Sequence, residues 1–169
     1  AFGRTYYIIP DGNGNWKKTD PRLDRDRTNN TNISKNGRVL GVIRATKYWN
    51  KRATMPSMSS YLIENMILDY YESNYTETSQ YVDVELVNVF GDIKSRVYNT
   101  VNDPKNIQGN INTLTWDEKT KISNRASSDY EKAKEAKPDN RQLWGQYLLN
   151  IYWKLDKEKY NALEKELGY

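Results

Sequence analysis

The chain of 169 residues contains no cysteine and no histidine. Disulfides, cysteine-based zinc sites and catalysis by a Cys or His side chain are therefore excluded within this chain. Long apolar runs are absent as well, since none approaches the roughly 20 residues that a membrane-spanning helix requires. The first ten residues, AFGRTYYIIP, lack the apolar stretch of a signal peptide. We expect a cytoplasmic protein that does not contact a membrane.

Hydrophobic residues make up only 37% of the chain, but fourteen tyrosines and five tryptophans add apolar surface with polar tips. The net charge is +4, from 26 basic and 22 acidic residues. Positive charge is concentrated between Arg4 and Lys51, where eleven lysines and arginines stand against four aspartates. This uneven distribution favours an anionic ligand over chance.

The amino-terminal region predicts one strand followed by irregular structure. Residues 6–9 form a short apolar run that Pro10 ends, which is typical of a strand. Residues 11–15 are rich in turn-forming types, and residues 16–32 are so polar that we interpret them as a long loop. A single strand does not make a sheet. We therefore expect it to pair with a sheet outside this domain or to lie unpaired.

Hydrophobic periodicity predicts about five helices in the rest of the chain. Residues 79–100 alternate like a strand at first, but their longer repeat is helical and too long for a strand. Ser57 is the expected N-cap of the second helix, and Thr115 with Glu118 forms a capping box for the fourth. The expected helices cover approximately residues 36–49, 57–70, 79–100, 115–133 and 138–155.

Several short motifs, taken in order, resemble the carboxy-terminal half of the cGAS/DncV-like nucleotidyltransferases. Animal oligoadenylate synthetase is a more distant relative of this family. The motifs are YIIP at 7–10, Trp16 with TDP at 19–21, IRATKYWN at 43–50, SYLIE at 60–64, and Asp103-Pro104 followed by Asn110. The likeness extends from about Phe2 to Ala136. Family members are bacterial synthases of cyclic oligonucleotides, which typically serve antiviral defence.

The resemblance implies a mixed-sheet core like that of polymerase β, a helical domain, and a nucleotide cleft between them. The fold class of this chain would then be mainly α: about five helices, with one N-terminal strand left over from a missing catalytic core. Residues 1–32 would belong to the end of that core and the crossover. Residues 33–169 would be the C-terminal α-helical nucleotide-binding domain.

The catalytic signature of the family is not found in this chain. In the family, a Gly-Ser pair, an Asp-x-Asp motif and a third acidic residue hold two magnesium ions, which carry out the phosphoryl chemistry. The chain has no Gly-Ser pair, and its Asp83-Val84-Glu85 segment lies in an expected helix. The magnesium ligands would lie upstream. We expect Mg²⁺ and nucleoside triphosphate to act in the full-length parent, and the fragment alone to bind no metal and to be inactive.

Four residues are candidates for nucleotide binding. Lys47 matches a lysine that reaches the triphosphate in relatives, and Arg44 lies one turn earlier on nearly the same face. Ser60 lies in the first turn of an expected helix, where free N–H groups and the helix dipole favour an anion. Tyr61 matches an aromatic residue that can stack on a base. From the residues alone, other interpretations stay open: Lys47 and Arg44 also fit a solvated helix face, and Ser60 also fits an N-cap. Tyr61 could lie in the apolar core, and Trp49 is expected there as well.

The leading hypothesis is a nucleoside-triphosphate-binding domain of a synthase of cyclic oligonucleotides, with its own missing core as a partner. One alternative is a stand-alone helical interaction module whose basic face binds protein or nucleic acid. Another is the C-terminal domain of an RNA- or tRNA-tailing nucleotidyltransferase. Nucleic acid is less favoured as a partner than a nucleoside triphosphate.

Overall fold

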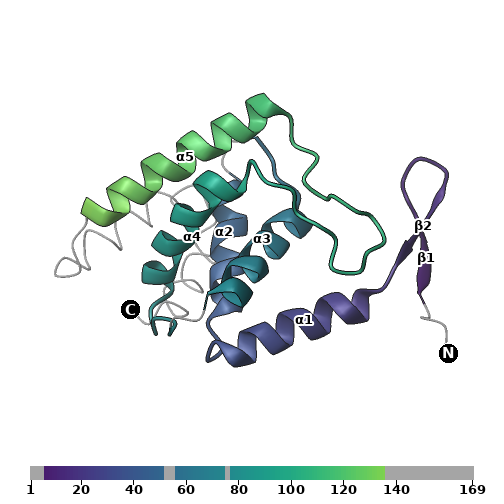
Figure 1. Cartoon of the computed structure of the whole chain (residues 1–169), viewed down its shortest axis with the longest axis horizontal. Helices are drawn as coiled ribbons and strands as arrows, with labels where there is room; N and C mark the ends of the chain where they lie inside the picture. The colour runs from purple at the N-terminus through teal and green to yellow at the C-terminus, as the bar shows by residue number, and fades with distance from the viewer. Residues whose placement is uncertain (1–5, 52–55, 75–76, 136–169) are drawn as a thin grey trace, which may run out of the picture.

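The computed structural model describes residues 6–51, 56–74 and 77–135. The elements in these ranges are β1 (Tyr7–Pro10), β2 (Trp16–Thr19), α1 (Pro21–Ser34), α2 (Val39–Asn50), α3 (Ser60–Ser73), α4 (Val82–Arg96) and α5 (Trp116–Glu135). The helices gather into one body, and the two strands extend from the start of α1 (Figure 1). The mainly helical fold class is confirmed. The helix expected at 138–155 lies outside the described residues.

β1 and β2 form an antiparallel hairpin in which Tyr7 pairs with Thr19 and Ile9 pairs with Lys17. The turn between them is organised by Asp11, whose carboxylate accepts the N–H groups of Asn13 at 2.8 Å and Asn15 at 3.0 Å. The first strand therefore finds its partner within the chain. The expectation that it pairs outside the domain or lies unpaired is wrong, because the turn returns the chain directly along β1.

α1 occupies much of the segment expected to be a long loop, and that expectation is also wrong. Asp20 is its N-cap, with a side chain that accepts the N–H of Arg22 at 3.3 Å. Pro21 follows at the first helical position, where its missing N–H costs nothing and its fixed φ suits the helix. These are ordinary helix-start signals, but no apolar stripe follows them.

Polar contacts hold α1 against α3. The Arg27 guanidinium donates to Asn65 Oδ1 at 2.7 Å, to Asp69 Oδ1 at 2.6 Å and to both carboxylate oxygens of Glu72. Thr31 also donates to Glu72, at 2.9 Å. The Arg27 side chain is only 17% exposed, whereas those of Asp69 and Glu72 are 34% and 40% exposed, so these charged bonds are only partly shielded from water. α1 is docked by charge, which hydrophobic periodicity does not detect.

The apolar core lies among the other four helices. Trp49 is fully buried, as expected, and its ring packs on Phe90 with the ring centroids 5.0 Å apart. α4 is helical throughout 82–96, which confirms the helical interpretation of that ambiguous segment. The largest buried side chains are Trp49, Tyr71, Phe90, Leu62, Ile63, Met66, Ile67, Leu86, Ile93, Ile122 and Val39.

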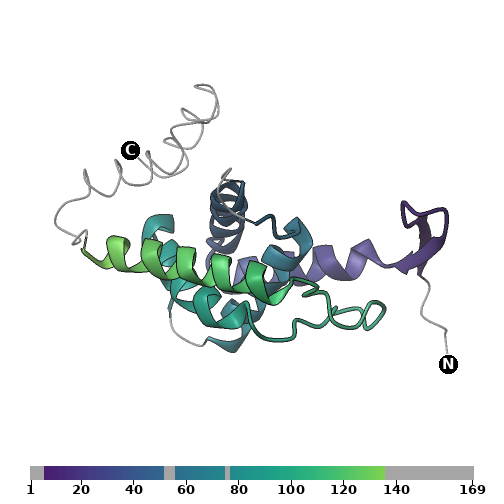
Figure 2. The same cartoon turned by 90° about the horizontal axis from the view of Figure 1, so that it is seen from above.

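Side-chain caps mark the starts of α3 and α5. Ser59 is the N-cap of α3, and its hydroxyl accepts the Leu62 N–H at 3.1 Å. The expectation of Ser57 as the cap is wrong by two residues. The capping box of Thr115 and Glu118 is confirmed, with reciprocal bonds of 2.8 Å and 3.3 Å. The loop between α4 and α5 extends toward the side of the hairpin in both views (Figures 1 and 2).

Among the described residues, no helix is both long and apolar enough to cross a bilayer.

The contact between Asp129 of α5 and Trp49 of α2 can be tested by measuring the free energy of unfolding. Asp129 is 1% exposed; its Oδ2 accepts the Trp49 indole N–H at 2.7 Å and the Arg125 Nε–H at 3.0 Å. We expect Asp129→Ala to lower the free energy of unfolding by about 3 kcal/mol, because it leaves these donors without their acceptor. Asp129→Asn retains an oxygen acceptor and should cost about half as much. Urea unfolding of the three proteins measures both values, and equal losses would contradict this explanation.

Candidate functional site

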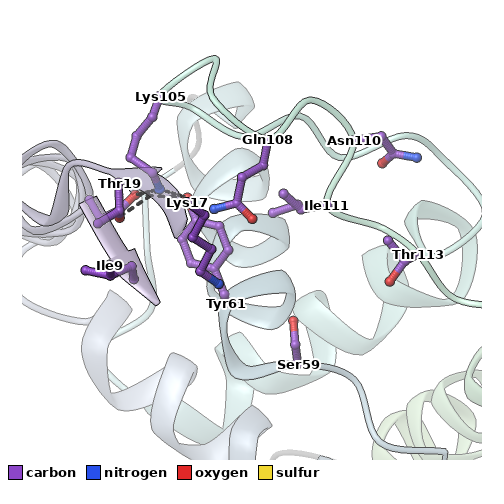
Figure 3. Close-up of a pocket in the computed structure, with 11 residues that line it drawn as sticks. Ile9, Lys17, Thr19, Ser59, Tyr61, Lys105, Gln108, Asn110, Ile111 and Thr113 are labelled. Carbon is purple, nitrogen blue, oxygen red and sulfur yellow. Dashed lines mark hydrogen bonds and ion pairs between the residues drawn. The ribbon is translucent and has the colours of Figure 1, made fainter. Parts of the chain in front are cut away.

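A hollow of about 530 Å³ lies between the hairpin, the start of α3 and the loop that joins α4 to α5 (Figure 3). This volume is in the usual range for a small-molecule site. The hairpin contributes one wall, the loop another, and α3 and α1 the base. The lining residues are Ile9, Lys17, Thr19, Asp24, Ser59, Tyr61, Lys105, Gln108, Asn110, Ile111 and Thr113.

The base of the hollow is a buried ammonium group. Lys105 Nζ lies 2.9 Å from both carboxylate oxygens of Asp24 and 3.0 Å from Asp103 Oδ1. It also donates to the hydroxyl oxygen of Tyr61. The Lys105 side chain is 2% exposed and that of Asp103 is fully buried. The contacts therefore tie α1, α3 and the α4–α5 loop together at one charged point.

The charges of this cluster stabilise one another. Burial alone would raise the pKa of Asp103, but hydrogen bonds from the Tyr61 hydroxyl and the Lys105 ammonium, helped by backbone N–H groups, lower it to about 2. Burial would lower the pKa of Lys105, but its bonds to Tyr61, Asp24 and Asp103 outweigh that effect and raise it. Burial also raises the pKa of Tyr61, so its hydroxyl stays protonated. Asp103 and Lys105 are thus both charged at neutral pH.

Asp103 also shapes the loop that walls the hollow. Its Oδ2 accepts the N–H groups of Ile107 at 3.1 Å and Gln108 at 3.0 Å, and its own N–H donates to the Gly109 carbonyl at 2.7 Å. Asn106 and Gly109 adopt positive φ angles of 53° and 66°, which this tight course of the chain requires. The loop is therefore wound around a buried carboxylate, and this gives Asp103-Pro104 a structural role.

The first turn of α3 presents donors at the edge of the hollow. The Ser59 hydroxyl caps the Leu62 N–H. Within the described part of the chain, the N–H groups of Ser60 and Tyr61 have no hydrogen-bond partner. Unpaired N–H groups at a helix start, together with the helix dipole, favour an anion. Ser60 itself is exposed and Tyr61 is half-buried.

The structure brings Lys47 to α3 but engages it in an ion pair. Its Nζ lies 2.8 Å from Glu64 Oε2, and the other oxygen of Glu64 accepts the Thr28 hydroxyl at 3.2 Å. Glu64 is one helical turn beyond Ser60, so Lys47 ends close to the start of α3. Arg44 lies on α2 one turn before Lys47 and is exposed. Among these candidates, Tyr61 lines the hollow; a shared triphosphate at Lys47 and Ser60 stays a prediction.

Sequence reasoning did not single out Asp24, Lys105 or Gln108 as site residues. Asp24 lies in the segment interpreted as a loop, so the sequence offered no face on which to place it. Lys105 lies two residues after Asp103, and Asp103-Pro104 is one of the motifs of the family resemblance. The opposite charges on either side of Pro104 were the only local indication of a site at Lys105. Gln108 is one of several polar residues in that loop, and nothing in its local sequence distinguishes it.

The described residues do not fit a magnesium site. Among them, no group of three or more acidic, His or Cys side chains converges on one point. Asp24 and Asp103 flank the Lys105 ammonium instead. Glu85, from the acidic pair in α4, is buried and accepts the Tyr71 hydroxyl at 2.8 Å and the Ser79 N–H at 2.7 Å.

Comparison with known proteins gives one informative similarity. No family model matches the chain. The chain is 48% identical over 131 residues to a protein of Bacillus cereus strain VD146 named "Probable cyclic nucleotide synthase". The match covers 78% of this chain and 39% of that relative, so the chain spans well under half of the relative's length. This similarity agrees with the resemblance stated above: over most of its length, the chain is similar to a protein named as a probable cyclic nucleotide synthase.

Acidification tests the charge of Asp103. Its folded pKa of about 2 lies below the ordinary value, so its stabilising effect is complete above pH 4 and is lost as the pH falls toward 2. From pH 5 to pH 2, we expect the free energy of unfolding to fall by about 2 kcal/mol more in the wild type than in Asp103→Asn. Urea unfolding at a series of pH values measures this gap. A gap that does not change with pH would refute an ionised Asp103.

Proposed function

We propose that this chain is the triphosphate-binding helical part of a nucleotidyltransferase that makes cyclic oligonucleotides. The similarity to a relative named as a cyclic nucleotide synthase supports the class of reaction. The fact that the chain spans 39% of that relative supports a division of labour, in which other parts of a longer protein supply the metal-binding carboxylates. The signal produced would serve antiviral defence in the bacterial cytoplasm.

The observation that carries the proposal is the start of α3 at the edge of the hollow. The N–H groups of Ser60 and Tyr61, which have no hydrogen-bond partner among the residues that the structure describes, favour an anion there. The Tyr61 side chain lines the same space, so an anion at the helix start and a base on the ring would lie within one ligand. Lys17 of the hairpin lines the opposite side and adds a cation. This combination fits a nucleoside triphosphate better than an uncharged ligand.

Lys47, Ser60 and Arg44 would hold the triphosphate in this arrangement. The Lys47 ammonium reaches α3 at Glu64, one turn from the helix start. The side chains of Lys47 and Glu64 are 29% and 28% exposed, so an incoming phosphate can approach the ammonium from solvent. A triphosphate carries more charge than one carboxylate and attracts the ammonium more strongly. Glu64 would then keep only its contact with the Thr28 hydroxyl at 3.2 Å, which that hydroxyl shares with the Asp24 carbonyl at 2.9 Å.

Magnesium enters this proposal only through the longer protein. The described residues offer no set of carboxylates for it, and no step of the reaction is assigned to them. Their part is to bind the nucleotide, orient its triphosphate at the start of α3, and place its base at Tyr61. Orientation of this kind accelerates phosphoryl transfer, because the reacting groups are held in position.

Two variants of one ion pair separate ligand binding from helix packing. In the full-length protein, Lys47→Ala should weaken binding of a non-hydrolysable nucleoside triphosphate by about 1.5–3 kcal/mol, the usual contribution of a charged hydrogen bond. Glu64→Gln removes the same ion pair but leaves the ammonium in place, so it should not weaken binding. Isothermal titration measures the affinities, and thermal unfolding checks that both variants are folded.

Ser60→Ala is the companion test of the helix start. It should cost about 1 kcal/mol of binding, because the backbone donors remain when the hydroxyl is removed. If Lys47→Ala and Glu64→Gln bind the triphosphate equally well, Lys47 is a packing residue and the proposed phosphate site is wrong.

The chain by itself should be catalytically inactive. Incubated with magnesium and all four ribonucleoside triphosphates, the 169-residue chain should form no product above a buffer blank. It has no Gly-Ser pair, and although Asp24-Arg25-Asp26 has the Asp-x-Asp spacing, it follows no such pair and Asp24 is bonded to the Lys105 ammonium. The full-length protein should form cyclic oligonucleotides under the same conditions. Mass spectrometry of the products distinguishes these from tailed RNA, and turnover by the short chain would show that the metal ligands have been misplaced.

A further inference from the structure

The α4–α5 loop holds Gln108 in a fixed position at the hollow. Its backbone N–H donates to the buried Asp103 carboxylate at 3.0 Å, and the next residue, Gly109, accepts the Asp103 N–H at 2.7 Å. The backbone is therefore anchored on both sides of this residue. A side chain on such a backbone is well suited to specific recognition, because little conformational freedom of the main chain is lost when a ligand binds.

The carboxamide of Gln108 is available, whereas that of its neighbour Asn110 is not. Asn110 Oδ1 accepts the N–H groups of Val101 at 3.2 Å and Asn112 at 3.0 Å, so this side chain builds the loop. The Gln108 carboxamide is exposed and has no hydrogen-bond partner among the described residues. Figure 3 shows it directed into the hollow, toward the space beside Tyr61 and Lys17.

The chemistry of Gln108 suits a base better than phosphate as its ligand. Gln108 is a neutral side chain that lines the same hollow as Tyr61, where Lys17 and Lys105 already supply cations; the Lys105 ammonium lies 4.3 Å from the centroid of the Tyr61 ring, so a base would stack on the opposite face of that ring. A base stacked on that ring would present its edge to a side chain from the loop wall. A carboxamide carries one donor and one acceptor side by side, and this pattern matches the N7 and N6 groups of adenine.

We propose that Gln108 is a specificity-determining residue that reads the edge of an adenine base held at Tyr61. This inference rests on the function proposed above and adds the base to it. The contact is a pair of hydrogen bonds, in which the carboxamide N–H donates to N7 and its oxygen accepts from the N6 amino group. Guanine presents acceptors at both positions, so it satisfies only half of the pair.

The test uses the full-length protein and non-hydrolysable analogues of ATP and GTP. Gln108→Met keeps the length of the side chain and removes both hydrogen-bonding groups without adding charge. We expect the affinity for the ATP analogue to fall roughly tenfold, and the affinity for the GTP analogue to change less than twofold. Inorganic tripolyphosphate, which has no base, should bind equally well to both proteins. Asn88→Met is the matched control, because Asn88 is an exposed carboxamide on α4 that does not line the hollow.

The outcomes separate this inference from the proposed function. Equal losses for both analogues, no loss for either, or a selective loss for the GTP analogue would each overturn adenine recognition by Gln108 while leaving triphosphate binding intact. A wild-type protein that binds neither analogue and no tripolyphosphate would instead refute the proposed function, and with it this inference. Asn88→Met should bind both analogues like the wild type. A selective loss of affinity in this variant would show that the measured affinities respond to changes outside the hollow.

Discussion

The buried ammonium of Lys105 is the constraint on which the candidate site depends. It joins Asp24 of α1, the Tyr61 hydroxyl of α3 and Asp103 of the α4–α5 loop. These three segments are far apart in the sequence, and each contributes to the hollow. Removing the charge would leave two carboxylates near one another in a poorly solvated place, which is strongly unfavourable. Electrostatic neutralisation at Lys105 therefore contributes to the relative position of the walls, in addition to the apolar packing of Val101, Ile111 and Leu114 of the loop.

Two kinds of interaction hold the molecule together: apolar burial and ion pairs. Trp49, Phe90 and their neighbours bury apolar surface among α2, α3, α4 and α5, which fixes those helices without regard to pH. α1 is attached through Arg27 to acidic partners, and the α4–α5 loop is attached both through Lys105 and through Val101, which is part of the apolar core. The hairpin leads directly into the start of α1, so we expect its position to depend on how α1 is attached. A site walled by such segments should be more sensitive to acid than the core beneath it.

This division explains what the sequence could and could not predict. The helices around Trp49 were predictable because buried residues recur with helical spacing. α1 was not, because Arg27 and Thr31 dock it by polar contacts that leave no apolar stripe. The partner of β1 was missed for a similar reason: β2 is Trp-Lys-Lys-Thr and exposed, unlike a typical strand. At the site, the family resemblance singled out Tyr61, but Lys105 and Gln108 meet it only through the three-dimensional course of a loop.

The same ammonium also decides whether an anion can approach the hollow at all. Asp24 lines the base of the site and Asp103 lies directly behind it. Without a cation, their combined charge would oppose a triphosphate bound in the hollow, in surroundings where charges interact strongly. Lys105 offsets part of that charge and leaves its Tyr61 contact in place. In the proposed site, the attractive groups would be the side chain of Lys17 and the N–H groups of Ser60 and Tyr61, which have no partner in the described part of the chain. In the proposed function, Lys105 would favour nucleotide binding without touching the nucleotide, because it reduces the repulsion that the site's own carboxylates would create.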